Sequence, residues 1–283
     1  MAKIYNESAL TPMKRVIMCP PTYHHFEPIN VITEEWIAKG ETADLAAYKR
    51  EWEELVKAYE DNGIKVELMD PKPDLPYEVY SRDFGASVRE GVVMGAFREP
   101  CRRGESAEYE AKLKELGVPI VARCTAGAFE GGDFWFLDPY TIAHGVVART
   151  DWDGFTNVKR QLEEKGYMVY GVDCRRDNLH LDMCFNIVGD RIALCCTAAM
   201  PDNFLAMLEK RGFDLIDIPQ EGVYRHHCNV QNIGDNKVVS FANNEYANSE
   251  MEKRGLKVIK PHLEQLLKGG GGPHCSTFPL ERW

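Results

Sequence analysis

The sequence predicts an α/β protein in which five similar modules form a closed ring around a central site. Two observations lead to this prediction. A helix that stops at a glycine and continues directly into a strand occurs five times along the chain. Each interval between these copies also holds one or two short β runs upstream of its helix, so the repeating unit is strand, strand, helix, glycine, strand. Five such units favour a ring over an open sheet, because each unit can bury its face against its neighbours.

The first copy has a helix over 45–62, with apolar residues from Leu45 to Tyr59 on one face, and a strand over 64–69. The later helices cover 109–116, 155–165, 204–211 and 246–254, and their strands cover 118–121, 167–170, 213–216 and 256–259. The closing glycines are Gly63, Gly117, Gly166, Gly212 and Gly255. The alternative is an ordinary α/β protein, in which helix, glycine and strand often follow one another.

Composition places the chain among soluble globular proteins. With 283 residues, 44% of them hydrophobic, it can build a substantial core. No linker rich in proline, glycine or serine divides it, so we expect one domain over residues 1–283. No stretch approaches the roughly 20 apolar residues that span a bilayer. The first residues also lack the pattern of a signal peptide, and a cytoplasmic location is expected.

Charge and cysteine content exclude further classes. The net charge of −10 argues against a nucleic-acid-binding surface, which would need a basic face, and suits a cationic substrate. Nine cysteines, an odd number without CxxC pairs, fit free thiols in a reducing compartment. The sequence leaves a homo-oligomer open.

One cysteine stands out from the nine. Cys275 follows the run Gly269–Gly272, and such a run lets the backbone bend sharply and lie against a small ligand. This position suits a nucleophile. A lone cysteine is nevertheless more often a buried or idle thiol, so the assignment depends on the rest of the chain.

Other polar residues interrupt the apolar pattern where modules start or strands end, and a ring would turn them inward. They are Asp83 in Ser81-Arg82-Asp83, Glu130 in Glu130-Gly-Gly-Asp133, and the pair His180 and Asp182. If the pair lies in a strand, both side chains point to one face. Taken singly, the first two segments could be plain turns and the pair a structural contact.

Two chemistries compete for this set. Cysteine, histidine and aspartate all bind metals, and His226-His227-Cys228 adds three more ligands, but no compact metal-binding spacing occurs. Several carboxylates around one thiol and one imidazole instead suit a guanidinium, which carboxylates hold bidentately. The thiolate would attack its central carbon, and a nearby cation would lower the thiol pKa. This scheme needs no metal or cofactor, and 226–228 become structural residues.

In their order and spacing these segments resemble the guanidine-modifying pentein superfamily, which includes arginine deiminases, arginine dihydrolases, dimethylargininases and amidinotransferases. The resemblance covers nearly the whole chain. It is carried by Asn30 and its preceding residues, 81–83, 98–105, 129–133, 148–150, 180–182 and 269–275. It implies a five-bladed α/β propeller of pseudo-fivefold ββαβ modules around a central active site.

The resemblance also implies a role for each candidate. Cys275 matches the nucleophile that forms a covalent thiouronium intermediate, and His180 matches the general acid and base. Glu130 matches the carboxylate that orients the histidine and also binds the guanidinium. Asp83 and Asp182 match the guanidinium clamps. For the substrate α-carboxylate the matching residues are Arg102 and Arg149, helped by Asn30, although Arg103 could face the site in place of Arg102.

The choice of reaction turns on Ser81. Dihydrolases carry an asparagine at this position, and its loss favours a single hydrolysis of free L-arginine to L-citrulline and ammonia. The alternatives are a dihydrolase that gives ornithine, CO2 and ammonia, a dimethylargininase and a glycine amidinotransferase. A non-catalytic binding protein of the same fold predicts loss of the thiol and the histidine, and both are present.

Overall fold

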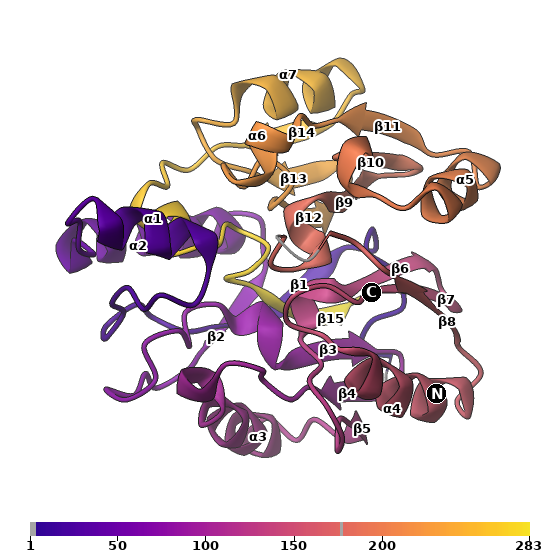
Figure 1. The fold of residues 1–283 in the computed structure, drawn as a ribbon, viewed down its shortest axis with the longest axis horizontal. Helices are drawn as coiled ribbons and strands as arrows, with labels where there is room; N and C mark the ends of the chain where they lie inside the picture. Colours follow the sequence, from indigo (N-terminus) through magenta and orange to yellow (C-terminus); the bar gives the residue numbers. More distant parts are fainter. Residues whose placement is uncertain (1–3, 176–177) are drawn as a thin grey trace.

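The computed structural model describes residues 4–175 and 178–283 and contains five sheets of three strands each (Figure 1). In each sheet one strand pairs antiparallel with one neighbour and parallel with the other. Four sheets follow the chain: β3 (Gly85–Val88), β4 (Gly91–Met94) and β5 (Ile120–Arg123); β6 (Phe134–Asp138), β7 (Thr141–Gly145) and β8 (Met168–Val172); β9 (Phe185–Gly189), β10 (Ile192–Cys195) and β11 (Asp214–Asp217); β12 (Gln231–Gly234), β13 (Lys237–Val239) and β14 (Lys257–Ile259).

The fifth sheet joins the two ends of the chain. Its central strand β1 (Met13–Met18) pairs antiparallel with β15 (Phe278–Arg282) and parallel with β2 (Lys65–Leu68). Cys275, the predicted nucleophile, lies just before β15. The pairing of β15 with β1 therefore anchors the segment that carries Cys275 to the amino-terminal part of the chain.

In every sheet a helix connects the central strand to the parallel strand. These helices are α2 (Leu45–Glu60), α3 (Glu105–Glu115), α4 (Trp152–Glu163), α5 (Asp202–Lys210) and α7 (Glu245–Lys253). Figure 1 shows them around the periphery, with the strands toward the middle. Short helical segments complete the described chain: α1 (Val31–Ala38), α6 (Gln220–Val223), α8 (Gln265–Lys268) and the 3-10 turns η1 (Ser81–Phe84), η2 (Pro100–Arg102), η3 (Gly131–Asp133), η4 (Leu181–Met183) and η5 (Thr197–Ala199).

The predicted passage from helix through glycine to strand is present in all five copies. The five closing glycines have φ between 67° and 92°, a left-handed conformation that side chains with a Cβ rarely adopt. All five strands begin one or two residues later than predicted, and the two-residue difference is at β5. Pro119 falls within the predicted strand 118–121, but proline has no N–H to donate, and the ladder of β5 starts at Ile120.

Helix α2 packs as predicted along most of its apolar face. Tyr48, Leu55 and Tyr59 are fully buried, although Leu45 at the start of the helix is exposed. The Tyr59 hydroxyl lies 2.7 Å from Thr277 Oγ1, two residues after Cys275. The helix therefore helps to fix the segment that carries the predicted nucleophile.

The residues predicted to be catalytic lie in segments that lead directly into a strand. Asp83 is in η1 before β3, and Glu130 lies immediately before η3 and β6. His180 has an extended backbone, but Asp182 lies in η4 before β9, so the expectation that both lie on one strand face is wrong. The 3-10 turn, not strand alternation, sets the relative directions of these two side chains.

Two general expectations can be compared with the structure. All nine cysteines are free thiols. Among residues 4–175 and 178–283, no helix combines the length and apolar character needed to cross a membrane. Residues 1–3, part of the amino-terminal stretch considered for a signal peptide, lie outside the described residues.

Candidate active site

Six buried side chains from five segments meet in one cluster, and we call this group the central cluster. Its members are Asp83, Glu130, His180, Asp182, Asn229 and Cys275, each at most 3% exposed. The five residues predicted as catalytic are all included. Asn229 is new, and it precedes β12 in the same way that the others precede β3, β6, β9 and β15.

His180 has a carboxylate beside each ring nitrogen. Its Nε2 lies 2.9 Å from Glu130 Oε2, and its Nδ1 lies 3.8 Å from Asp83 Oδ1. Burial alone would lower the pKa of His180, but the charges of Asp83, Glu130 and Asp133 outweigh burial and raise the pKa to about 10. The ring is therefore an imidazolium at neutral pH and holds a proton it can donate.

Asp133 joins the segments of Glu130 and His180. Its Oδ1 accepts a 2.8 Å hydrogen bond from the Leu181 backbone N–H, and its Oδ2 accepts a 2.6 Å hydrogen bond from the Thr150 hydroxyl. The same hydroxyl accepts from the Glu130 backbone N–H at 3.2 Å. Asp133 thus holds the backbone next to His180 directly and the backbone of Glu130 through Thr150.

Cys275 lies against a carboxylate and an amide. Its Sγ is 3.3 Å from Asp182 Oδ2 and accepts a 3.0 Å hydrogen bond from Asn229 Nδ2. Burial, followed by the charges of Asp182 and Asp83, raises the thiol pKa well above its usual range. In the protein without substrate, the Cys275 pKa is therefore raised, whereas the sequence led us to expect a pKa lowered by a nearby cation.

Asp182 is held by His274. Its Oδ2 lies 2.7 Å from His274 Nδ1, and the imidazole of His274 stacks on Trp135 with ring centroids 4.6 Å apart. Burial lowers the pKa of His274 to about 4, so this histidine is neutral and donates its Nδ1 proton to the carboxylate. The hydrogen bond leaves Asp182 Oδ1 without a partner.

The glycine run before Cys275 packs against protein groups. A Cβ on Gly269 or Gly271 would collide with the Tyr80 side chain, and a Cβ on Gly270 would lie 2.6 Å from Asn30 Nδ2. These contacts give a structural reason for glycine at these positions. Glycine is required because the loop threads between Tyr80 and Asn30.

Arg149 and Asn30 share a cavity of about 210 Å³ whose lining also includes Glu34, Glu99 and Tyr224. Arg149 Nη2 donates a 2.6 Å hydrogen bond to the Ile29 carbonyl, and its Nη1 is buried without a hydrogen-bond partner. The same Nη1 lies 3.8 Å from Glu130 Oε2. The Asn30 side chain caps helix α1 by accepting from Ile32 and Thr33. The structure thus brings these two predicted residues together near the central cluster.

Arg102 faces inward, and Arg103 is exposed. The Arg102 guanidinium is already engaged: Nη1 lies 2.6 Å from Asp83 Oδ2, and Nε and Nη2 bind both oxygens of Glu105. Further hydrogen bonds run to the carbonyls of Tyr77 and Tyr80. These contacts make Arg102 a residue that positions Asp83, in place of the carboxylate-binding role expected from the sequence.

Ser81 is buried, but its hydroxyl is directed to a different set of groups. It accepts a 3.0 Å hydrogen bond from the Tyr109 hydroxyl and lies 3.5 Å from the Glu78 carbonyl. Its described hydrogen bonds therefore do not reach the central cluster.

Ligand atoms of Asp83, Glu130 and His180 lie within 4.8 Å of one another, a spacing that a metal ion could use. The two carboxylates face the two nitrogens of the same imidazole, and the raised pKa keeps both nitrogens protonated. Ion pairing explains the spacing.

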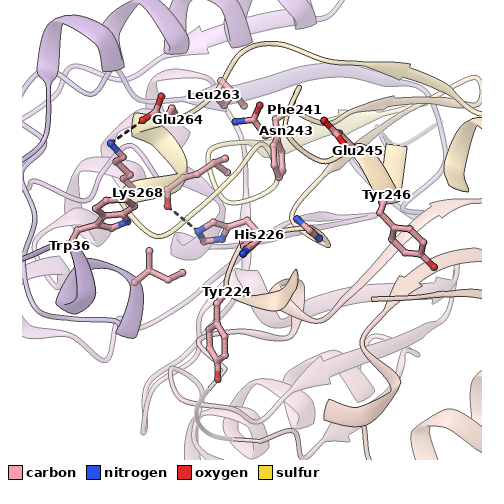
Figure 2. Close-up of a pocket in the computed structure, with 14 residues that line it drawn as sticks. Trp36, Tyr224, His226, Phe241, Asn243, Glu245, Tyr246, Leu263, Glu264 and Lys268 are labelled. Carbon is pink, nitrogen blue, oxygen red and sulfur yellow. Dashed lines mark hydrogen bonds and ion pairs between the residues drawn. The ribbon is translucent and has the colours of Figure 1, made fainter. Parts of the chain in front are cut away.

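Of the residues 226–228, predicted to be structural, His226 and His227 border another cavity. Figure 2 shows this cavity of about 610 Å³, which is lined by Trp36, His226, Phe241, Tyr246 and Lys268 among others. His226 Nε2 donates a 2.9 Å hydrogen bond to the Leu267 carbonyl. Cys228 is fully buried, and its carbonyl accepts from Asn186.

Sequence reasoning missed Asn229, Asp133 and His274 as functional neighbours. A positional signal was available for Asn229, because four of the five segments that precede a first strand already supplied a candidate. No sequence signal identifies His274 as the partner of Asp182, since the two residues are 92 positions apart.

A family model described as N,N dimethylarginine dimethylhydrolase, eukaryotic, matches residues 21–282. The chain belongs to this family. The match confirms the resemblance to the guanidine-modifying pentein superfamily, and the protein is an enzyme of the guanidino-group hydrolase kind.

Individual proteins similar to this chain share less than 30% of its sequence. The uncharacterized protein YkgA of Bacillus subtilis is 28% identical over 270 residues, which cover 95% of this chain and 92% of YkgA. An arginine deiminase of Bacillus cereus is 27% identical over 261 residues, covering 76% of this chain and 63% of the deiminase. The product-bound N-terminal domain of ArgZ, a cyanobacterial arginine dihydrolase, superposes with a TM-score of 0.84 at 22% identity and covers 95% of this chain and 97% of that domain. This likeness shows the pentein fold.

Proposed function

We propose that the protein hydrolyses the guanidino group of free L-arginine to L-citrulline and ammonia. The observation that carries this proposal is a pair of buried carboxylate oxygens without hydrogen-bond partners, Asp83 Oδ1 and Asp182 Oδ1. Both carboxylates act electrostatically on Cys275. A guanidinium supplies the N–H donors that these oxygens lack, and it places its central carbon near Sγ.

Substrate binding would also prepare the nucleophile. The Cys275 pKa is raised by burial and by the two carboxylates, so the free enzyme holds a neutral thiol. A guanidinium between the carboxylates neutralises their effect on sulfur and favours the thiolate. The thiol proton passes to Asp182 Oδ2 along their hydrogen bond and leaves with the ammonia as ammonium.

In the first chemical step the thiolate attacks the guanidinium carbon and forms a C–S bond. His180 then donates its proton to the departing nitrogen, the C–N bond breaks, and ammonia leaves from a covalent thiouronium. His180 is suited to this step because it is protonated at neutral pH.

In the second step the now neutral His180 accepts a proton from water, which attacks the same carbon. The C–S bond breaks, the carbon retains the oxygen of water as the citrulline carbonyl, and the second proton of that water passes to the sulfur. Glu130 stabilises the imidazolium of His180 before the first step and after the second, because its carboxylate is 2.9 Å from Nε2.

The cavity lined by Arg149 suits the amino-acid end of the substrate. Arg149 Nη1 has no hydrogen-bond partner in the free protein and supplies a donor for an α-carboxylate. Glu34 and Glu99 supply negative charge for an α-ammonium group, and Asn30 lies in the same lining. Opposite charges in one small cavity favour a free amino acid over a substrate without a carboxylate.

The engagement of Ser81 supports a single hydrolysis. Its hydroxyl is bonded to Tyr109, so this position offers no polar group to hold a citrulline-like intermediate for a second attack. The proposed products are therefore citrulline and ammonia, without ornithine.

Dimethylarginine is the second candidate, and the family match favours it. The product would again be citrulline, released with dimethylamine. Dimethylation removes both N–H groups from one terminal nitrogen and leaves fewer donors for Asp83 Oδ1 and Asp182 Oδ1. We therefore place unmethylated arginine first.

We also propose that the five sheets close into a propeller with the central cluster on its axis. In support, every sheet repeats the same strand pairing, and the segment before the first strand of each sheet contributes a member of the cluster. A crystal structure with five blades around Cys275 would test this arrangement.

The reaction is tested by product analysis. Purified protein is incubated separately with arginine, asymmetric dimethylarginine and agmatine, and citrulline, ornithine, ammonia and dimethylamine are measured by mass spectrometry. We expect citrulline and ammonia from arginine, no loss of rate in a chelator, and no turnover by Cys275→Ser. Ornithine as the main product, or a preference for dimethylarginine, would overturn the choice of arginine deimination.

A further inference from the structure

We propose that Asn229 is a catalytic residue whose side-chain N–H stabilises the thiolate form of Cys275. The inference rests on the proposed role of Cys275 as the nucleophile. Asn229 is buried, and its Nδ2 lies 3.0 Å from Sγ, the reacting atom.

The orientation of the Asn229 amide is determined by its other contacts. Oδ1 accepts hydrogen bonds from two backbone N–H groups, that of Cys275 at 3.1 Å and that of Gly272 at 2.9 Å. Only an oxygen can accept both. The opposite end of the amide, which faces Sγ, must therefore be the NH2 group.

The backbone around Asn229 is also anchored. Its N–H donates 2.8 Å to the His226 carbonyl, and its own carbonyl accepts from His274 at 3.4 Å. The dashed line from His226 in Figure 2 marks the hydrogen bond to the Leu267 carbonyl, which ties this turn to the segment leading into the glycine run. The donor is thus held in place before any substrate binds.

A hydrogen bond to sulfur strengthens when the sulfur becomes charged, so the Asn229 N–H favours the thiolate over the thiol. This hydrogen bond is needed because burial and the neighbouring carboxylates raise the Cys275 pKa and so favour the thiol. The titratable and charged groups that act on Cys275 include Asp182, Asp83, Tyr48, Tyr80 and Arg82, and the guanidinium of Arg82 alone is cationic among these five. Asn229 is the neutral group that lowers the Cys275 pKa.

Two substitutions separate donation from positioning. Asn229→Asp keeps an oxygen that can accept from Cys275 and Gly272 but replaces the donor on Sγ by a second oxygen. Asn229→Ala removes both functions. Asn244→Ala is the matched control, because Asn244 is a buried amide that donates 3.0 Å to the His227 carbonyl, two residues before Asn229.

The readout is the pH midpoint of Cys275 alkylation by iodoacetamide, followed on the peptide that contains this cysteine, in the absence of substrate. Loss of a hydrogen bond to a charged group should raise the midpoint by about one to two pH units in Asn229→Ala, and at least as much in Asn229→Asp. Asn244→Ala should keep the wild-type midpoint. In arginine turnover, kcat should fall about 10- to 100-fold in both Asn229 variants, with KM changed less.

An unchanged midpoint in Asn229→Asp would overturn the proposal and leave Asn229 a positioning role. So would an equal rise in Asn244→Ala. The alkylation measurement does not depend on the substrate, so a shifted midpoint in a protein that fails to hydrolyse arginine would refute the proposed function and leave the role of Asn229 standing.

Discussion

Cys275 Sγ lies 3.3 Å from Asp182 Oδ2, so the proposed nucleophile of the free enzyme rests against an anion. Such a thiol resists ionisation until a cation occupies the site. This coupling protects a buried thiol from unwanted reactions and gives the substrate charge a part in its own activation.

Replacing Cys275 by Ala or Ser should abolish turnover. Without Sγ no covalent intermediate can form, and we expect kcat/KM to fall at least about a thousandfold. Circular dichroism and the urea midpoint should remain close to wild type. Substantial activity in either variant would refute the covalent scheme.

Asp182→Asn should separate the two effects of this carboxylate. Removing the negative charge should lower the pH midpoint of Cys275 alkylation, because the thiolate is no longer repelled. The loss of a guanidinium clamp should nevertheless reduce kcat/KM by about 100-fold or more. A midpoint that rises would show that Asp182 does not oppose ionisation of the thiol.

Glu130→Gln should move the basic limb of the pH profile. The general acid acts as an imidazolium, so kcat/KM is retained below the His180 pKa of about 10 and lost as the pH rises through it. Removing the Glu130 charge destabilises the imidazolium and lowers this pKa, so the limb should shift toward neutral pH. Rates measured from pH 6 to 11 test this, and an unmoved limb would assign it to another group.

Arg149→Ala should weaken binding of arginine. We expect KM to rise about 10- to 100-fold, the loss of one charged hydrogen-bonding partner, with a smaller change in kcat. Agmatine, which lacks the α-carboxylate, is the matched comparison, and its kinetic constants should change little. Equal losses for both compounds would place Arg149 outside carboxylate recognition.

Arg102→Ala should destabilise the fold. The change leaves Asp83 and Glu105, both buried, without their shared cation, which we expect to cost about 3 to 5 kcal/mol in the free energy of unfolding. Arg103→Ala is the control, because Arg103 is exposed and should shift stability by less than about 0.5 kcal/mol. Chemical denaturation of both variants provides the comparison.

Local sequence signals were sufficient for the repeated elements. A glycine that ends a helix requires a left-handed φ, and hydrophobic periodicity marks the helix before it, so Gly63 and its four counterparts could be placed from the chain alone. The predicted catalytic residues were also identified correctly as a group that meets, since each interrupts an apolar pattern at a comparable position.

Contacts between distant segments decided the rest. Arg102 was predicted to bind substrate, but Glu105 and Asp83 occupy its donors. Asn229 was not among the predicted site residues, and the fold places its amide on Cys275, 46 positions away. The sequence by itself determined the helix, glycine and strand repeats and the set of reactive side chains, because these follow from backbone conformation and local polarity. Only the tertiary structure decided which side chains neutralise, orient or ionise one another, because hydrogen bonds and buried charges depend on distances of a few ångströms between remote parts of the chain.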